Sequence, residues 1–199
     1  MKRSIFLMAS LLYCSSAYAV ELPKPISPAR LSQALKSGKR VKVAFLNKNS
    51  DGKTGGCIGV DHARKDSDVP LKRFRCDLPL NNTPNNQYWI ITPTKIPGED
   101  GADGRYVTIR NWKSDKCMGV DNGSPLPHAE IRQFDCRNHP NQKWKFSFIK
   151  RGNRGAVSIQ NYDNLCVSLG RGNKDGGQLT QEKCSASRDQ DWRTIPFRY

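Results

Sequence analysis

The chain has 199 residues, of which 36% are hydrophobic, and a formal net charge of +15 at pH 7. Its length suits one domain with one core. No apolar segment after the first twenty residues is long enough to span a bilayer, so we expect a soluble domain without a transmembrane segment. The positive charge favours acidic partners, namely sialylated or sulfated glycans, anionic membrane, a partner protein or nucleic acid. Because the basic residues are scattered rather than gathered in a run, charge alone does not select one of these classes.

The N-terminal residues have the pattern of a signal peptide. The basic pair Lys2-Arg3 precedes a mostly apolar run, Ile5 to Tyr13, and Ala17-Tyr18-Ala19 is an A-x-A cleavage signal. We therefore predict that residues 1–19 are removed and that the mature protein is secreted or periplasmic. The alternative is a lipoprotein acylated at Cys14, and the bulky Tyr13 before that cysteine argues against it.

The cysteine count indicates disulfide bonds. Loss of the leader removes Cys14, so that seven cysteines become six, and the net charge falls from +15 to +13. An even number of cysteines in an exported chain favours a disulfide set. No C-x-x-C or H-x-x-x-H pattern is present, so we expect neither a zinc site nor another metal or cofactor.

Residues 20–40 form a Pro-rich segment that we expect to be an arm outside the core domain. A short helix is expected over residues 28–37, with Ser27 as its N-cap and Gly38 as its C-terminal stop. Its apolar stripe would consist of Leu31, Ala34 and Leu35. Two interpretations stay open, a flexible tail and a segment that docks on a partner.

From residue 41 onward the pattern changes to that of an all-β domain. Three segments alternate between apolar and polar residues, end at an Asn and lead into a polar turn before a cysteine. They are Val41–Asn47, Tyr106–Asn111 and Ala156–Asn161. No stretch after residue 40 keeps a helical period for three turns.

A threefold repeat organises this domain. Its markers are a first cysteine, a second cysteine 18 or 19 residues later, and a Gln-x-Trp. The first cysteines are Cys57, Cys117 and Cys166, the second are Cys76, Cys136 and Cys184, and the Gln-x-Trp motifs begin at Gln87, Gln142 and Gln190. We place the repeats at about 41–104, 105–154 and 155–199, the first being lengthened by insertions at 78–85 and 96–104.

The repeat predicts both the disulfide pairing and the core. Six cysteines allow fifteen connectivities, and threefold repetition favours one bridge inside each unit. Those bridges are Cys57–Cys76, Cys117–Cys136 and Cys166–Cys184. A Trp at the same place in every unit, namely Trp89, Trp144 and Trp192, is expected to fill a shared barrel-like core, while the neighbouring Gln fixes a turn by a side-chain hydrogen bond.

These cysteine pairs and three Gln-x-Trp motifs resemble the ricin-type β-trefoil lectins over residues 41–199. The resemblance implies a β-trefoil of twelve strands with pseudo-threefold symmetry, a carbohydrate-binding module, and no catalysis by this domain. In the family, an Asp two residues after the first cysteine and an Asn just before Gln-x-Trp bond sugar hydroxyls. An aromatic residue before the second cysteine stacks on the pyranose.

This chain keeps only part of that sugar site. The usual Asp is replaced by Gly59, Gly119 and Ser168 in the three units. The aromatic residue is kept in units one and two, and Glu182 and Asp189 stand in the third unit, which we expect to be structural. The candidate carbohydrate-binding residues are therefore Asp121, Phe134, Asn141 and Gln142 in the second unit, and Asp61, Phe74, Asn86 and Gln87 in the first.

The two candidate aspartates and the two glutamines each have a second interpretation. Asp61 and Asp121 stand two residues after the missing acceptor, and positions two apart on a strand face the same side. The alternative is that both are turn residues with solvent-facing side chains. Gln87 and Gln142 recur with Gln190 in every unit, which equally favours a scaffold role.

The pattern favours a secreted, non-catalytic module that binds carbohydrate or another cell-surface component. An exported ricin-like domain with a Pro-rich arm and no sugar Asp also resembles the cell-binding A and C subunits of cytolethal distending toxins. That resemblance implies a binding or delivery subunit, whose partners are a host cell-surface glycan or glycoprotein and other toxin subunits, including a nuclease subunit. The alternative is a structural assembly subunit that binds partner proteins and has lost sugar binding.

An enzyme and a direct nucleic-acid binder fit the sequence less well. His62, His128 and His139 belong to no Ser/His/Asp or Cys/His arrangement, and bridged cysteines supply no thiol nucleophile. Direct nucleic-acid binding suits the charge, but export and disulfide bonds make it less natural.

Overall fold

The computed structural model describes residues 24–47, 56–76, 84–94, 106–148, 155–170 and 175–196. The predicted signal peptide with Cys14, and nearly all of both insertions in the first repeat, lie outside these residues. The described strands are β1 (Val41–Asn47), β2 (Gly56–Val60), β3 (Val69–Arg75), β4 (Trp89–Thr94), β5 (Tyr106–Asn111), β6 (Cys117–Val120), β7 (Ile131–Phe134), β8 (Trp144–Phe148), β9 (Val157–Asn161), β10 (Leu165–Leu169), β11 (Gly177–Lys183) and β12 (Arg193–Pro196). The three alternating segments are thus strands, and the third begins one residue later than expected.

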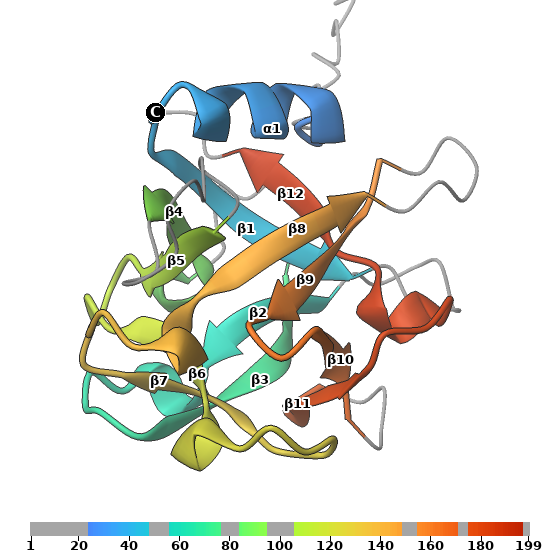
Figure 1. Ribbon diagram of the computed structural model, residues 1–199. Helices are drawn as coiled ribbons and strands as arrows, with labels where there is room; N and C mark the ends of the chain where they lie inside the picture. Colours follow the sequence, from blue (N-terminus) through green and yellow to red (C-terminus); the bar gives the residue numbers. More distant parts are fainter. Residues whose placement is uncertain are drawn as a thin grey trace, which may run out of the picture.

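Six strands, namely β1, β4, β5, β8, β9 and β12, form a barrel, whose arrangement can be followed in Figure 1. Antiparallel pairs join β12 to β1, β1 to β4, β4 to β5, β5 to β8 and β8 to β9. An antiparallel bridge between Val157 and Trp192 completes the circle between β9 and the residue before β12. Each repeat thus supplies two barrel strands, and the barrel is left without an open edge.

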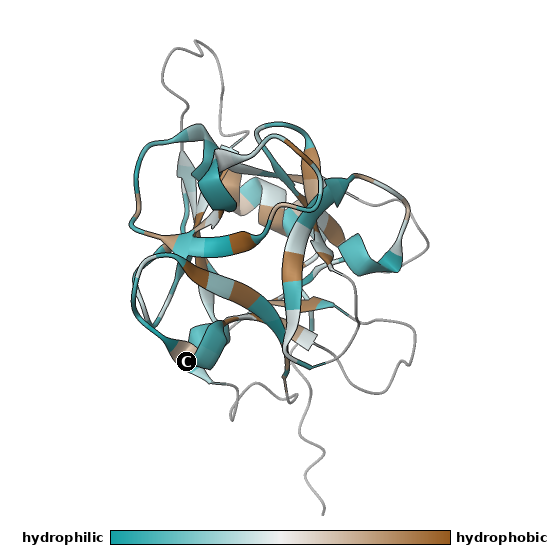
Figure 2. Cartoon of the chain, turned by 90° about the horizontal axis from the view of Figure 1, so that it is seen from below, coloured by the Kyte–Doolittle hydropathy of each residue, from teal (hydrophilic) through white to brown (hydrophobic). Residues whose placement is uncertain are grey.

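The other six strands form three hairpins that close one end of the barrel. They are β2–β3, β6–β7 and β10–β11. The hairpins pair with one another in a triangle, through Val69 with Gln133, Gly177 with Arg73, and Glu130 with Thr180. Seen along this axis, the hydrophobic stretches lie on strands around the centre and the outer connections are mostly hydrophilic (Figure 2). A six-stranded barrel capped by three hairpins is a β-trefoil, as predicted.

Three tryptophans fill the core at equivalent places. Trp89, Trp144 and Trp192 are each 0% exposed. Each indole Nε1 donates to a carbonyl on the first hairpin strand of its own repeat, and the acceptors are Ile58 (2.9 Å), Met118 (3.0 Å) and Val167 (3.0 Å). Every repeat therefore joins its barrel strand to its hairpin by one buried hydrogen bond, which satisfies the polar end of an otherwise apolar side chain.

The three predicted disulfide bonds are present. Cys57 pairs with Cys76, Cys117 with Cys136, and Cys166 with Cys184. Each bridge joins the first hairpin strand to a cysteine one or two residues after the second hairpin strand. In the chain-entropy model, a loop of this size contributes about 3 kcal/mol to the free energy of unfolding.

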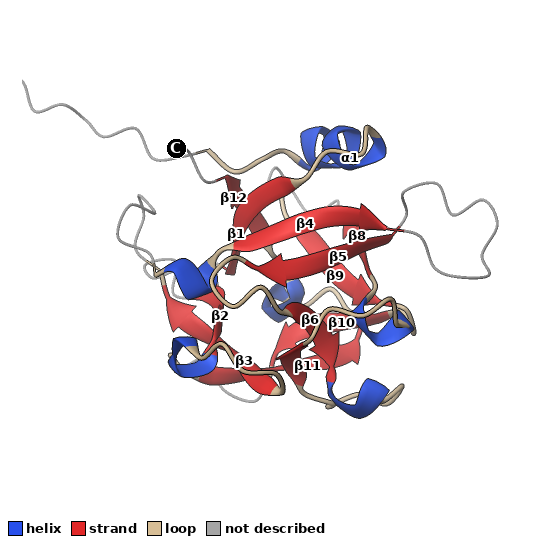
Figure 3. Ribbon diagram, turned by 90° about the vertical axis from the view of Figure 1, so that its left-hand side faces the viewer, coloured by secondary structure: helices blue, strands red, loops and turns tan. Residues whose placement is uncertain are grey.

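The expectation of an arm outside the core is wrong for the helix. Helix α1 (Pro28–Lys36) begins at the predicted N-cap Ser27 and lies over the end of the barrel opposite the hairpins (Figure 3). Leu31 and Leu35 are 1% and 6% exposed and belong to the same hydrophobic cluster as the three tryptophans. A backbone hydrogen bond from Ile26 N to Thr194 O, 2.8 Å, ties the segment before the helix to β12. No helix among the described residues is long and apolar enough to cross a membrane.

Candidate functional site

A surface pocket of about 300 Å³ lies on the outer side of the second repeat. Three of the predicted site residues line it, namely Phe134, Asn141 and Gln142. The other lining residues are Ser67, Asp135, Arg137 and His139. The structure thus brings together most of the second candidate set, and Asp121 is not among the residues that line this pocket.

The turn that follows β7 is held in place by Gln142. Its side-chain Oε1 accepts from the backbone N–H of Arg137 at 2.8 Å, and its Nε2 donates to the carbonyl of Asp135 at 2.9 Å. Gln190 makes the equivalent pair of bonds in the third repeat, with Ser185 N and Lys183 O. These bonds match the scaffold interpretation of the glutamine and explain how Gln142, 3% exposed, positions the pocket wall.

The residue that replaces the family's Asp explains the position of the aromatic ring. A Cβ atom built on Gly119 would lie 2.9 Å from Phe134 Cδ2 and 3.2 Å from Gln142 Cγ. The same holds at Gly59, where the distance to Phe74 Cδ2 would be 2.8 Å. In both repeats the phenyl ring therefore packs on the glycine backbone, in the space that an aspartate side chain would need.

The two candidate aspartates lie in turns rather than on strands. Strand β6 ends at Val120, and Asp121 begins the 3₁₀ turn η4 (Asp121–Gly123). Strand β2 likewise ends at Val60, and Asp61 begins η1 (Asp61–Ala63). The argument that positions two apart share a face of one strand therefore does not apply, because the backbone turns at this point.

Asp61 is already engaged with neighbouring cations. Its carboxylate lies 2.9 Å from Lys72 Nζ and 3.1 Å from His62 Nδ1. Burial alone would raise the pKa of Asp61, but the hydrogen bond and charge of Lys72, with a smaller contribution from His62, hold that pKa below its usual value. Both carboxylate oxygens of Asp61 are thus engaged within the protein.

Asp135 is an acidic residue of the pocket that the sequence interpretation did not identify. It follows Phe134 directly, lines the pocket, and its carboxylate lies 2.5 Å from Lys116 Nζ. That hydrogen bond and the positive charge of Lys116 keep the pKa of Asp135 below its ordinary value of 3.8. The pocket therefore presents an ionised carboxylate at neutral pH. Sequence could have suggested it, since an acidic residue stands here only in the second unit.

Asn141 and His139 also line the pocket. Asn141 Nδ2 donates to the carbonyl of Val120 at 3.3 Å, so the turn η5 (Pro140–Gln142) is tied to the end of β6. Its Oδ1 lies 2.6 Å from His139 Nδ1. The exposed His139 therefore lies beside the predicted asparagine, where its imidazole can donate or accept.

The first repeat keeps the predicted residues, but the residue after its phenylalanine is basic and not acidic. Asn86 is 7% exposed and donates from Nδ2 to the carbonyl of Val60 at 2.9 Å, as Asn141 does to Val120. Gln87 Nε2 donates to the carbonyl of Arg75 at 3.4 Å. Arg75 stands where the second repeat has Asp135, so the acidic acceptor beside Phe74 is replaced by a cation.

The third repeat uses the corresponding positions for contacts within the protein. Glu182, which replaces the aromatic residue, accepts from Thr180 Oγ1 at 2.8 Å and lies 3.0 Å from His128 Nδ1. Asp189 lies in the turn η6 (Arg188–Gln190), where its backbone N–H donates to Ser187 Oγ at 3.2 Å. These contacts agree with the predicted structural role of the third repeat.

Comparison with known proteins identifies a family and several similar structures. By sequence, residues 85–182 match the family described as ricin-type beta-trefoil lectin domain-like. No match was found among curated proteins.

Several solved structures share the fold. An exo-β-1,3-galactanase from Clostridium thermocellum has a TM-score of 0.66 at 21% identity, covering 79% of this chain and 30% of its own. For the Rhizoctonia solani agglutinin the TM-score is 0.61 at 14% identity, covering 79% of this chain and 95% of that one. The Haemophilus ducreyi cytolethal distending toxin gives a TM-score of 0.56 at 15% identity, with 81% and 84% covered.

At these identities the structural likeness shows the fold alone, and the chain spans only 30% of the galactanase. The family match, the twelve strands in three repeats and the three disulfide bonds agree with one another. Residues 85–182 therefore match the ricin-type beta-trefoil lectin domain-like family, and the described strands fold as a β-trefoil.

Proposed function

We propose that this protein is an exported, non-catalytic carbohydrate-binding module that uses its second repeat to bind a host cell-surface glycan or glycoprotein. The observation that carries this proposal is the pocket of about 300 Å³ in which Phe134 lies with Asp135, His139 and Asn141. The three disulfide bonds suit an oxidising compartment outside the cytosol.

The pocket has the chemistry that a pyranose requires. A sugar ring carries hydroxyls at its rim and an apolar C–H face, so its site needs acceptors, donors and an aromatic surface. Asp135 offers an ionised acceptor, Asn141 and His139 offer further polar atoms, and the half-buried Phe134 offers the aromatic surface. The second repeat can therefore bind a sugar although the usual aspartate is absent.

Within this proposal the module acts as the binding or delivery subunit of a multi-subunit toxin. The support is the similarity in fold to the Haemophilus ducreyi cytolethal distending toxin over 81% of this chain. A delivery subunit needs one surface for the cell and another for its partner subunits, one of which would be a nuclease. The second repeat would supply the surface for the cell.

A second candidate function is a structural assembly subunit that has lost sugar binding. The observation in its favour is that three large apolar side chains are exposed among the described residues. These are Leu126 (67% exposed), Trp112 (44%) and Tyr162 (39%). In this case Gly59 and Gly119, which stand in place of the usual aspartate, would reflect the loss of sugar binding.

A glycan array separates the two functions. We expect the wild-type protein to bind a defined set of glycans, Phe134→Ala to lose that binding, and Glu182→Ala, the matched change in the third repeat, to keep it. Absence of any glycan binding together with a co-purifying partner would favour assembly instead. Binding that falls steeply with salt and is indifferent to Phe134→Ala would assign recognition to the basic surface.

A further inference from the structure

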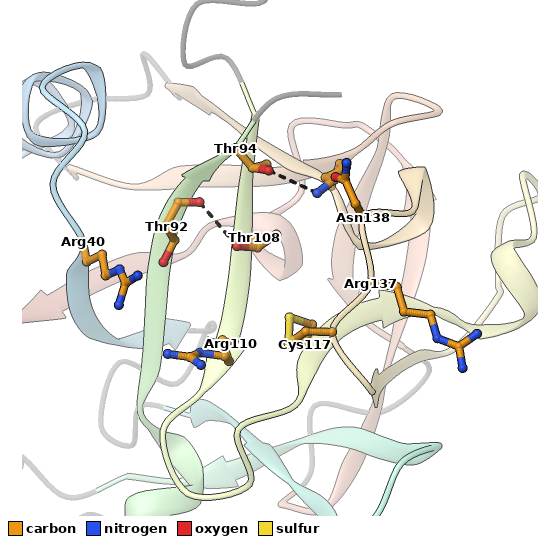
Figure 4. Close-up of a pocket in the computed structure, with 10 residues that line it drawn as sticks. Arg40, Thr92, Thr94, Thr108, Arg110, Cys117, Arg137 and Asn138 are labelled. Carbon is orange, nitrogen blue, oxygen red and sulfur yellow. Dashed lines mark hydrogen bonds between the residues drawn. A yellow bond between two sulfur atoms is a disulfide. The ribbon is translucent and has the colours of Figure 1, made fainter. Parts of the chain in front are cut away.

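A second and larger pocket, of about 570 Å³, lies beside the first one and is lined by basic and hydroxyl side chains (Figure 4). The polar lining residues include Arg40, Thr92, Thr94, Thr108, Arg110 and Lys143. Residues 92 and 94 lie on β4, and residues 108 and 110 on β5. Because Ile91 and Ile109 point into the core, the alternating residues of both strands point outward and form the floor of this pocket.

Among the residues that line this pocket, Lys143 is unusual because it is a buried lysine. It is the middle residue of the second Gln-x-Trp, its side chain is 2% exposed, and its Nζ donates to Thr94 Oγ1 at 3.1 Å. Within the described residues this hydroxyl is its only hydrogen-bond partner, and no carboxylate pairs with it. A buried ammonium group is normally paired with an anion, because leaving water without a counter-charge is unfavourable. Burial accordingly lowers the pKa of Lys143.

Two further cations face the same space. Arg40, which directly precedes β1, and Arg110 on β5 point their guanidinium groups toward one another on one side of the pocket (Figure 4). Arg110 also pairs with the exposed Asp115, at 2.8 Å from one of its terminal nitrogens, and keeps other donors for a ligand. No carboxylate is among the residues that line the pocket. Positive charge, hydroxyl donors and a buried ammonium therefore converge in a pocket whose lining residues include no carboxylate.

We propose that this pocket binds a sulfate or carboxylate group, with Lys143 and Arg110 as its principal donors, Arg40 at its edge, and threonine hydroxyls around it. Arg137 lines both this pocket and the smaller one that contains Phe134. An acidic saccharide can thus place its ring against Phe134 and its anionic group in the basic pocket. The saccharide part of this inference rests on the proposed function, whereas the anion site stands on Lys143 and its neighbours alone.

The first measurement is titration of the full chain with inorganic sulfate by calorimetry, at constant ionic strength maintained with chloride. The wild type is expected to bind sulfate, and Lys143→Met to weaken binding about tenfold or more, as for a lost hydrogen bond between charged groups. Arg40→Gln should weaken it about threefold. Lys113→Gln, which removes the same charge from an exposed residue outside both pockets, should leave binding unchanged.

The fold of the variants is checked by thermal unfolding. Lys143→Met removes a buried charge that has no described counter-ion and nearly preserves side-chain volume, so its unfolding temperature should not fall. If Lys143→Met does not fold, Arg40→Gln still tests the site. The proposal is overturned if both variants bind sulfate like the wild type, or if Lys113→Gln weakens binding as much as they do.

The second measurement compares a sulfated oligosaccharide with its desulfated parent. We expect tighter binding of the sulfated form, with the difference lost in Lys143→Met and all binding reduced in Phe134→Ala. Sulfate binding without binding of either saccharide would retain the anion site and reject the proposed function. Equal, Phe134-dependent binding of both saccharides, with no binding of sulfate ion, would retain the proposed function and reject the anion site.

Discussion

Gly119 determines where the Phe134 ring lies in the proposed sugar pocket. Its backbone lies against the Phe134 ring and the Gln142 side chain, and a Cβ there would fall inside normal contact distance of both. The loss of the family's aspartate is thus coupled to the position of the ring. An acceptor then has to come from elsewhere, and Asp135 is placed to supply it.

Gly119→Ala should lower the free energy of unfolding by about 1–3 kcal/mol, the range for overpacking a well-filled site. The cost should largely disappear in a Phe134→Ala background, because the ring that the new methyl meets is then absent. Chemical denaturation of the two single variants and the double variant gives the coupling energy. Additive effects would mean that the ring does not pack on Gly119.

The ion pair between Asp135 and Lys116 should make the free energy of unfolding fall as the pH is lowered into the acid range. Its folded-state pKa lies below the ordinary 3.8, because Lys116 donates to it and lies 2.5 Å away. Stabilisation from this pair is therefore fully present above the unfolded pKa and is lost as the pH falls through the folded pKa. Unfolding curves from pH 7 to pH 2 should show wild type and Asp135→Asn converging at the acid end. If the difference in unfolding free energy between wild type and Asp135→Asn stays constant down to pH 2, the lowered pKa of Asp135 is contradicted.

Among the elements, helix α1 is the one whose role the sequence misjudged. The N-cap, the first-turn proline and the stripe of Leu31, Ala34 and Leu35 predicted its position correctly. What the helix packs against could not be read from these residues, because an amphipathic stripe reports that a helix has a partner surface and does not identify it. The end of the barrel provides that surface.

Leu31→Ala should therefore destabilise the whole domain by about 2–5 kcal/mol, as for a buried leucine in a core. Gln33→Ala, on the exposed side of the same helix, should change stability by about 0.5 kcal/mol or less. Thermal unfolding of both variants distinguishes a core helix from a peripheral arm. If both substitutions change the stability equally and only slightly, the helix is a peripheral arm and not part of the core.

The strands were predictable and the turns after them were not. Period-two alternation located β1, β5 and β9, and the cysteine spacing predicted the disulfide bond inside each repeat. For Asp61 and Asp121 the turn interpretation is the one that the structure supports, because β2 and β6 end just before them. Asp135 and His139 reach the pocket through the turn that Gln142 holds, and periodicity does not describe such a turn.

The whole molecule is tied together by polar side chains buried between repeats. Gln133 Nε2 donates to the carbonyls of Arg64 and Asp66 in the first repeat, at 3.2 and 2.7 Å. Gln181 Nε2 donates to Ser124 O at 2.7 Å and Leu126 O at 2.6 Å in the second. Both glutamines are 0% exposed and occupy inward-facing positions where alternation predicts an apolar residue. The hairpins of the second and third repeats therefore each fix a loop of the preceding repeat.

Gln181→Leu should destabilise the domain by about 1–3 kcal/mol for each group left without a partner. Asn161 Nδ2, which donates to Gln181 Oε1 at 2.6 Å, loses its acceptor as well. Gln181→Glu keeps an acceptor for Asn161 but removes the donors for the two carbonyls, so it should also destabilise. Denaturant titration measures both changes, and a neutral Gln181→Leu would show that these bonds do not hold the repeats together.

Threefold repetition made the fold predictable, whereas the candidate sites lie where repetition fails. Asp135, Lys143 and His139 each differ from the equivalent residues of the other repeats, and Lys143 in particular occupies a variable position of an otherwise repeated motif. Comparison of the three units position by position would have marked them. Their convergence on two adjoining pockets follows from the three-dimensional fold and not from the repeat pattern.

The most direct test of the central claim is to map a bound sugar by amide chemical-shift changes, using a glycan selected on the array. We predict the largest changes at Phe134, Asp135, Asn141 and Gln142 in the second repeat. The equivalent segment of the third repeat, residues 182–190, should change little. Shifts concentrated in residues 182–190, or spread evenly over the basic surface without the second-repeat pocket, would contradict the account.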